Sequence, residues 1–206
     1  MKNFEVITPP MLVILIGAIL VAIGTFLATV RSAKERIQFE TELKTKNEKI
    51  AQLNEDIKNY ILGEGSYCYL SFATIDNGIA TFFLVHEGKY PLYDVNVRIV
   101  DLAEFNKIPS GQKLVHSDSY EKRGNLGNIN PGQGVIVGEY NLIDLKEKKL
   151  NIFFYARNGT FTQVMRLKNI KNKWVSATQV KKENQVLFTQ IDSDYPRTNE
   201  GEIDWN

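Results

Sequence analysis

The hydrophobic pattern of the chain changes twice, and the first segment predicts a membrane anchor. From Met11 to Val30 the residues are apolar or small and carry no charge. About twenty such residues span a hydrocarbon core of roughly 30 Å, whereas a cleavable secretion signal has an apolar region of only about 7–15 residues. We therefore expect a retained transmembrane helix at residues 11–30 after a short N-terminal flank at 1–10. A secretion signal is the alternative.

Between residues 31 and 62 the apolar residues become sparse and recur with a seven-residue period. Leu43 and Ile50 are one repeat apart, and Leu53 follows at the complementary position. Such a narrow stripe is typical of the seam of a left-handed coiled coil, so we expect a coiled-coil stalk at 31–62. An isolated amphipathic helix packed on the following domain is the alternative.

The same register continues backwards into the membrane span, where it meets mostly small residues. Small residues let helices approach closely in lipid, and threonine can hydrogen-bond across the contact. We hypothesise one continuous helix from about residue 10 to residue 62, paired in parallel with a second copy. A chance match of small residues is the alternative. The predicted seam of this homo-oligomer, most simply a dimer, comprises Ala18, Ala22, Thr25, Thr29, Phe39, Leu43, Ile50, Leu53, Ile57 and Tyr60.

Downstream of this helix the apolar period falls from seven to two. In "LYDVNVRIV" the series Tyr93, Val95, Val97 and Ile99 alternates with polar residues, as in an antiparallel strand with one wet face. About seven to eight such segments predict a mainly β fold, an antiparallel β-sandwich of immunoglobulin-like type over residues 66–192. The strongest turn signals are Asp76-Asn77-Gly78, Asn158-Gly159 and Lys171-Asn172-Lys173.

Two segments lack a regular pattern. Residues 103–133 contain many glycine and asparagine residues and predict irregular structure rather than strands. Residues 193–206 carry acidic residues together with Pro196 and Gly201, and we expect them to form a flexible acidic tail.

Two strand-like segments carry a resemblance to known domains. "EGKYPLYDVNVRIVD", followed at a distance by "INPGQGVIVGEYNL", resembles successive strands and the intervening proline-glycine turn of bacterial immunoglobulin-like or fibronectin-type domains. The order of anchor, short coiled coil, "GEGSYCYL" and sandwich is similar to that of a group of bacterial single-span membrane proteins. The resemblance lies in the fold and the order of parts, and it implies no activity and no functional residues.

The charges around the span predict its orientation. Lys2 precedes it, and Arg31, Lys34 and Arg36 follow it within two turns. Positive flanks favour the cytoplasmic side, so we expect a single-pass protein of the bacterial inner membrane with its C-terminal domain in the cytoplasm. The single cysteine, Cys68, cannot form an intrachain disulfide, which favours a reducing compartment. Display of the domain outside a bacterial membrane is the alternative.

The composition argues against several classes of function. A net charge of +1 suggests no nucleic-acid partner. The chain lacks a phosphate-binding loop, a dinucleotide fingerprint and a nucleophile elbow. Its 2 histidines and 1 cysteine are too few for an ordinary structural zinc site. We therefore expect no catalytic residues, no cofactor and no metal, and we expect that the protein is not an enzyme.

The sharpest enzymatic alternative is a hydrolase built on Cys68 and a histidine. Cys68 shares a predicted strand face with Leu70 and Phe72, so we interpret it as a small core residue. We interpret His86 as a solvated turn residue at a strand end. His116 suits a polar loop as well as a site, because Ser and Asp residues surround it.

Clustered aromatic residues on a sandwich face often mark a protein contact. The candidate partner surface comprises Tyr67, Tyr69, Phe153, Tyr155 and Trp205, although some of these residues suit a core position, and Trp205 also suits a loosely packed terminus. The lysines around "KNIKNKW" and "KKENQ" alternate with strand and turn residues, which favours solvated turns over a surface for anionic lipid or nucleic acid.

Together these features predict a membrane-anchored, dimerising interaction or scaffold protein that presents a β-sandwich for protein recognition. Its expected partners are the lipid bilayer, a second copy of the chain and an unidentified protein. The alternative is a membrane effector whose oligomerised span, lined by Thr25 and Thr29, perturbs the bilayer when the sandwich senses a ligand.

Overall fold

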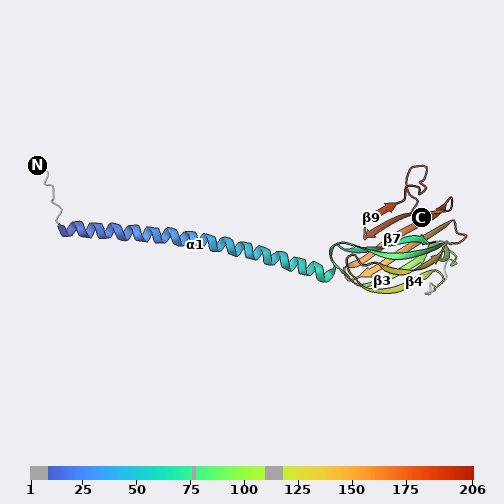
Figure 1. Ribbon diagram of the computed structural model, residues 1–206, viewed down its shortest axis with the longest axis horizontal. Coiled ribbons are helices and arrows are strands. Elements are labelled where there is room, and N and C mark those ends of the chain that lie inside the picture. The colour runs from blue at the N-terminus through green and yellow to red at the C-terminus, as the bar shows by residue number, and fades with distance from the viewer. Residues whose placement is uncertain (1–8, 76–77, 110–117) are drawn as a thin grey trace. The chain divides into compact units, whose positions relative to one another are not determined.

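A computed structural model describes residues 9–75, 78–109 and 118–206, and it divides the chain into two units, 1–56 and 57–206. The described residues form the long helix α1 (Pro9–Leu62), the short helix α2 (Leu102–Phe105) and nine strands (Figure 1). The strands are β1 (Tyr67–Ile75), β2 (Ile79–Glu87), β3 (Leu92–Asp101), β4 (Glu121–Ile129), β5 (Val135–Asn141), β6 (Glu147–Ala156), β7 (Gly159–Ile170), β8 (Lys173–Lys182) and β9 (Gln185–Ile191).

The helix α1 is continuous, as its sequence predicts, and its N-terminal part is long and apolar enough to cross a membrane. Pro9 and Pro10 occupy its first turn, where a missing N–H group costs no helical hydrogen bond. The hydroxyl of Thr25 donates to the carbonyl oxygens of Val21 and Ala22, and that of Thr29 donates to Thr25. Both threonines are therefore hydrogen-bonded within their own helix.

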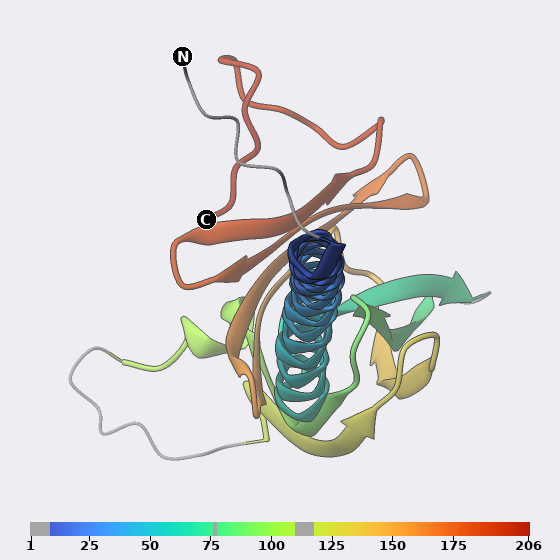
Figure 2. The same ribbon diagram turned by 90° about the vertical axis from the view of Figure 1, so that its left-hand side faces the viewer.

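The strands form two antiparallel sheets in a sandwich-like arrangement, which confirms the mainly β prediction. The smaller sheet has the order β1-β2-β5 and the larger has the order β4-β3-β6-β7-β8-β9. In Figure 2, β4 and β9 lie at opposite edges of the larger sheet. Side chains from both sheets form one core, in which Phe82 of β2 and Phe154 and Phe161 of the larger sheet are fully buried.

Strand β4 lies within the segment for which the sequence predicted irregular structure. Its buried residues, Glu121 and Ile129, are at its ends, and Gly124 and Gly127 lie between them. Apolar alternation is therefore absent. Among the described strands β4 pairs only with β3, and such an edge position tolerates glycine and charged residues.

In β3 the buried residues Val95, Val97 and Ile99 follow the predicted alternation, but Tyr93 does not. The register with β4 shifts between Leu92 and Val95, and Asp94 has a φ of 56°. This irregularity buries Leu92 and leaves Tyr93 only half-buried. The predicted alternation fails at Tyr93 because a bulge changes which side chains face inward.

Two predicted turns form as expected. Asn158 belongs to the two-residue turn that joins β6 to β7, and Lys171 and Asn172 join β7 to β8 with φ values of 50° and 64°. These left-handed conformations are those of a type I′ hairpin turn. Asp76 and Asn77 of the third turn lie outside the described residues.

The prediction of a flexible tail is not what the structure shows. Tyr195 is only 4% exposed and packs with Val175 and Ala177 in a second apolar cluster, against which Ile203 and Trp205 also pack. The carbonyl oxygen of Trp205 accepts two hydrogen bonds from the Arg166 guanidinium, at 3.0 and 2.5 Å. The polar composition concealed a few apolar side chains that are enough to hold the segment on β7 and β8.

Candidate functional site

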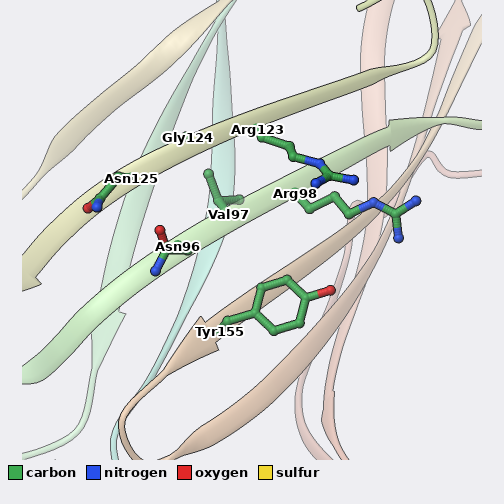
Figure 3. A pocket seen from close by; sticks show the side chains of 7 residues that line it. All are labelled: Asn96, Val97, Arg98, Arg123, Gly124, Asn125 and Tyr155. Carbon is green, nitrogen blue, oxygen red and sulfur yellow. The ribbon is translucent and has the colours of Figure 1, made fainter. Parts of the chain in front are cut away.

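A groove of about 520 Å³ lies over β4, β3 and β6 (Figure 3). Cross-strand pairing builds it, because residues opposite one another in an antiparallel ladder share a face. Arg98 of β3 lies opposite Arg123 of β4, and Asn96 lies opposite both Asn125 of β4 and Tyr155 of β6. The groove is lined by Asn96, Val97, Arg98, Arg123, Gly124, Asn125 and Tyr155.

One carboxylate fixes the two arginines of this groove. Glu121 is only 2% exposed, and its oxygens accept hydrogen bonds from Arg98 Nε at 2.6 Å and from Arg123 Nε at 2.5 Å. The hydrogen bond to Glu121 raises the pKa of the Arg98 guanidinium above its ordinary value, so this group stays charged. Two guanidinium groups against one carboxylate leave one net positive charge.

Aromatic side chains line the same face. The guanidinium carbon of Arg98 lies 5.4 Å from the ring centroid of Phe153, which is within the range of a cation–π contact. Tyr155 is 43% exposed, and Figure 3 shows its hydroxyl end directed towards Arg98. Of the five predicted surface aromatics, Tyr155 therefore lines the groove, and Phe153 contacts Arg98 on the same face without lining it.

The two asparagines lie away from the guanidinium ends of the arginines (Figure 3). Asn96 Nδ2 donates to the carbonyl oxygen of Asp94 at 3.0 Å, and Asn125 Oδ1 accepts from the N–H of Gly127 at 2.8 Å. Each amide is thus oriented by one bond to backbone and keeps a second polar atom, an oxygen on Asn96 and an N–H₂ group on Asn125.

The remaining predicted surface aromatics lie elsewhere. The placement of Tyr69 on a surface is wrong, because Tyr69 is 8% exposed and its ring stacks on Phe188 of β9 at a centroid distance of 4.5 Å. Side chains cover both faces of β1 at this point, whereas its sequence pattern predicted one buried face and one exposed face. Tyr67 is half-buried on β1, and Trp205 is half-buried in the C-terminal cluster.

The register of β1 and β2 places Cys68 opposite His86. Cys68 is fully buried, and its burial raises the pKa of the thiol to about 12, so the thiol is protonated at neutral pH. His86 is half-buried, with Nε2 2.9 Å from the carbonyl oxygen of Tyr90, so its interpretation as a solvated turn residue is wrong. It lies in the next-to-last residue pair of the β1–β2 ladder, one residue before β2 ends at Glu87. His116 lies outside the described residues.

The predicted seam residues of α1 from Phe39 to Leu53 are exposed in the single chain. Tyr60, the last of them, lies in the second unit, where its ring makes edge contacts with Tyr90 and Tyr93 at 6.4 and 6.5 Å. Ile57 is exposed. The final turn of α1 is therefore part of the same compact unit as the sheets.

The basic segment of β7 and β8 is largely tied to the fold. Lys173 Nζ lies 3.0 Å from a carboxylate oxygen of Asp194, and Lys168 Nζ lies 5.6 Å from the centroid of the Tyr195 ring. Within the described ranges, no group of three or more His, Cys, Asp and Glu residues is placed to hold a metal ion. The chain matches no family model, no curated protein and no solved structure.

Proposed function

We propose that this chain is a membrane-anchored, dimerising interaction or scaffold protein that recognises another protein through the groove over β4, β3 and β6. The observation that carries the proposal is the exposed ring of Tyr155 beside two guanidinium groups held by Glu121. Tyrosine and arginine are the residue types most often found at energetic centres of protein interfaces. Side chains that are fixed before binding lose less entropy when a partner docks.

The membrane span would confine the protein to a bilayer, and the positive residues after it favour a cytoplasmic sandwich at a bacterial inner membrane. A second copy would cover the exposed apolar side chains of Leu43, Ile50 and Leu53 in a parallel coiled coil. Two anchors in one bilayer raise the effective concentration of the stalks, which offsets the weakness of this short seam.

The antiparallel sheets also support an immunoglobulin-like or fibronectin-type assignment for the sandwich, in keeping with the resemblance of "EGKYPLYDVNVRIVD" and "INPGQGVIVGEYNL". We also propose that the chain belongs to the group of bacterial single-span membrane proteins that have the same order of anchor, short coiled coil and sandwich. Such folds carry many unrelated functions, so the groove and not the fold supports recognition.

The membrane-effector alternative is less well supported. It needs a span whose threonines face water, but the hydroxyls of Thr25 and Thr29 donate to carbonyl oxygens of their own helix. They therefore need no water-filled path. If Thr25→Leu with Thr29→Leu abolished an ion leak caused by overexpression, the effector function would replace our proposal.

Replacement of Tyr155 by the photo-crosslinking residue benzoylphenylalanine, which keeps an aromatic ring at this position, tests the proposal in the full-length chain expressed in native membranes. We expect an adduct with a protein other than the chain itself. Val186, an exposed apolar residue on the opposite edge strand β9, is the matched control position. Identical adducts at both positions, or no protein adduct at Tyr155, would contradict recognition through the groove.

A further inference from the structure

We infer that the groove over β4, β3 and β6 binds an acidic peptide segment, with the carboxylate of an Asp or Glu side chain held by Arg123 and Arg98. This inference rests on the proposed function, since it names the chemistry of the protein partner. It adds a charge preference that the proposed function does not require.

The arginines provide the carboxylate-binding end of the groove. Arg123 donates to Glu121 through Nε, and its side chain is still 59% exposed. A guanidinium carries five N–H donors in a rigid plane, so the side turned away from Glu121 can bind a second carboxylate with two parallel hydrogen bonds. Glu121 orients the guanidinium in advance, and Figure 3 shows the Arg98 and Arg123 side chains extending in the same direction.

The amount of charge favours a peptide carboxylate over a polyanion. Arg98, Arg123 and Glu121 together leave one positive charge, which a single Asp or Glu side chain neutralises. Nucleic-acid binding generally requires several neutralised phosphates, and recognition of anionic lipid uses clusters of about 4–8 basic residues. The lining residues include only two basic side chains, and the whole chain has a net charge of +1.

The rest of the groove suits peptide backbone and an apolar neighbour. The oxygen of Asn96 can accept from a peptide N–H, and the N–H₂ group of Asn125 can donate to a peptide carbonyl. The exposed ring of Tyr155 offers an apolar surface next to the arginines. The preferred segment is therefore an acidic residue with an apolar residue close to it in sequence.

Selection from a displayed library of random peptides tests this inference, with the full-length chain held in lipid nanodiscs. We expect Asp and Glu to be enriched in the selected peptides relative to the unselected library. The best peptide is then synthesised together with its Glu→Gln or Asp→Asn counterpart. Fluorescence anisotropy should show that the neutral peptide binds at least about tenfold more weakly, since charge-assisted hydrogen bonds contribute about 1.5–3 kcal/mol.

Arg123→Gln should weaken binding of the acidic peptide by a similar factor and leave the affinity for the neutral peptide nearly unchanged. Lys171→Gln, in the β7–β8 turn outside the groove, removes the same charge and should have no effect. Selected peptides without acidic enrichment, or an acidic peptide that binds Arg123→Gln as well as the native chain, would overturn the inference.

If Arg123→Gln lowers the melting temperature markedly, the comparison of acidic and neutral peptides on the native chain still decides the result. The two proposals fail separately. A protein adduct at Tyr155 without acidic preference removes the inference and keeps the proposed function. Absence of any protein adduct at Tyr155 removes the proposed function, whatever peptides are selected.

Discussion

The side chain of Gln163 on β7 pairs with the backbone of Leu70 on β1 as a neighbouring strand would. The Leu70 N–H donates to Gln163 Oε1 at 2.7 Å, and Gln163 Nε2 donates to the Leu70 carbonyl oxygen at 2.7 Å. Gln163 Nε2 also donates to Thr178 on β8 at 2.8 Å. These bonds join the two sheets and satisfy the backbone groups of Leu70 that point away from β2.

Gln163→Leu should therefore destabilise the sandwich by about 2–4 kcal/mol, because it leaves buried backbone donors and acceptors without partners. Thermal unfolding of the full chain in detergent, followed by tryptophan fluorescence, measures the change. Gln179→Leu is the control, since that amide makes only a 3.4 Å contact with Thr189 near the surface. Equal destabilisation by the two changes would contradict a special role for Gln163.

Gly63 ends α1 in a conformation that also requires the absence of a side chain. Its φ is 73°, and a Cβ atom there would lie 2.4 Å from the carbonyl oxygen of Pro91. Gly63→Ala should cost about 2–5 kcal/mol, the sum of a left-handed penalty and a steric clash. Gly65→Ala shares the positive φ of 71° but meets no atom within 4 Å, so it should cost only about 1–2 kcal/mol in the same unfolding measurement. Equal costs would show that the contact with Pro91 is unimportant.

The buried thiol of Cys68 makes stability depend on alkaline pH. Burial raises its pKa from 9.0 to about 12, so the folded state favours the protonated thiol. This contribution is fully present below about pH 9 and is lost as the pH rises towards 12. Burial also raises the pKa of Tyr140 to about 12, so the native chain must be compared with Cys68→Ala. The variant should lose less stability between pH 9 and 11; parallel stability profiles would contradict the assignment.

The proposed stalk predicts a specific crosslinking pattern in membranes. On a Cys68→Ser background, Leu53→Cys should form an oxidative dimer because it lies on the seam, whereas the off-seam variant Glu55→Cys should not. Thr25→Cys should crosslink as well if the span and the stalk share one register. A dimer at Leu53 without one at Thr25 would confine the pairing to the stalk.

Local periodicity was enough to predict much of this fold, and long-range pairing accounts for most of what was missed. The long helix and the alternation from Val95 to Ile99 follow from neighbouring residues, and both the helix α1 and the strand β3 formed, whereas the pairing of α1 with a second copy stays a prediction. The predicted surface position of Tyr69 is wrong because the ring of Phe188 in β9, far along the chain, covers it.

The groove shows the same distinction. The predicted partner surface includes Tyr155, and the apolar alternation of β3 leaves Arg98 on the outer side of that strand. Nothing in the sequence indicates that Arg123 and Glu121 lie beside them. That arrangement depends on the register between β3 and β4, and β4 itself has no apolar alternation. The closely spaced charges of "EKR" at Glu121–Arg123 were the available signal, and alone they suit a solvated turn equally well.

The most direct test combines the crosslinking residue at Tyr155 with Arg123→Gln in native membranes. We predict that the yield of the partner adduct falls several-fold with Arg123→Gln and is unchanged with Lys171→Gln, because the arginine contributes to binding whereas the turn lysine does not. An adduct of equal yield in the native chain and in both variants would contradict recognition by the arginine pair.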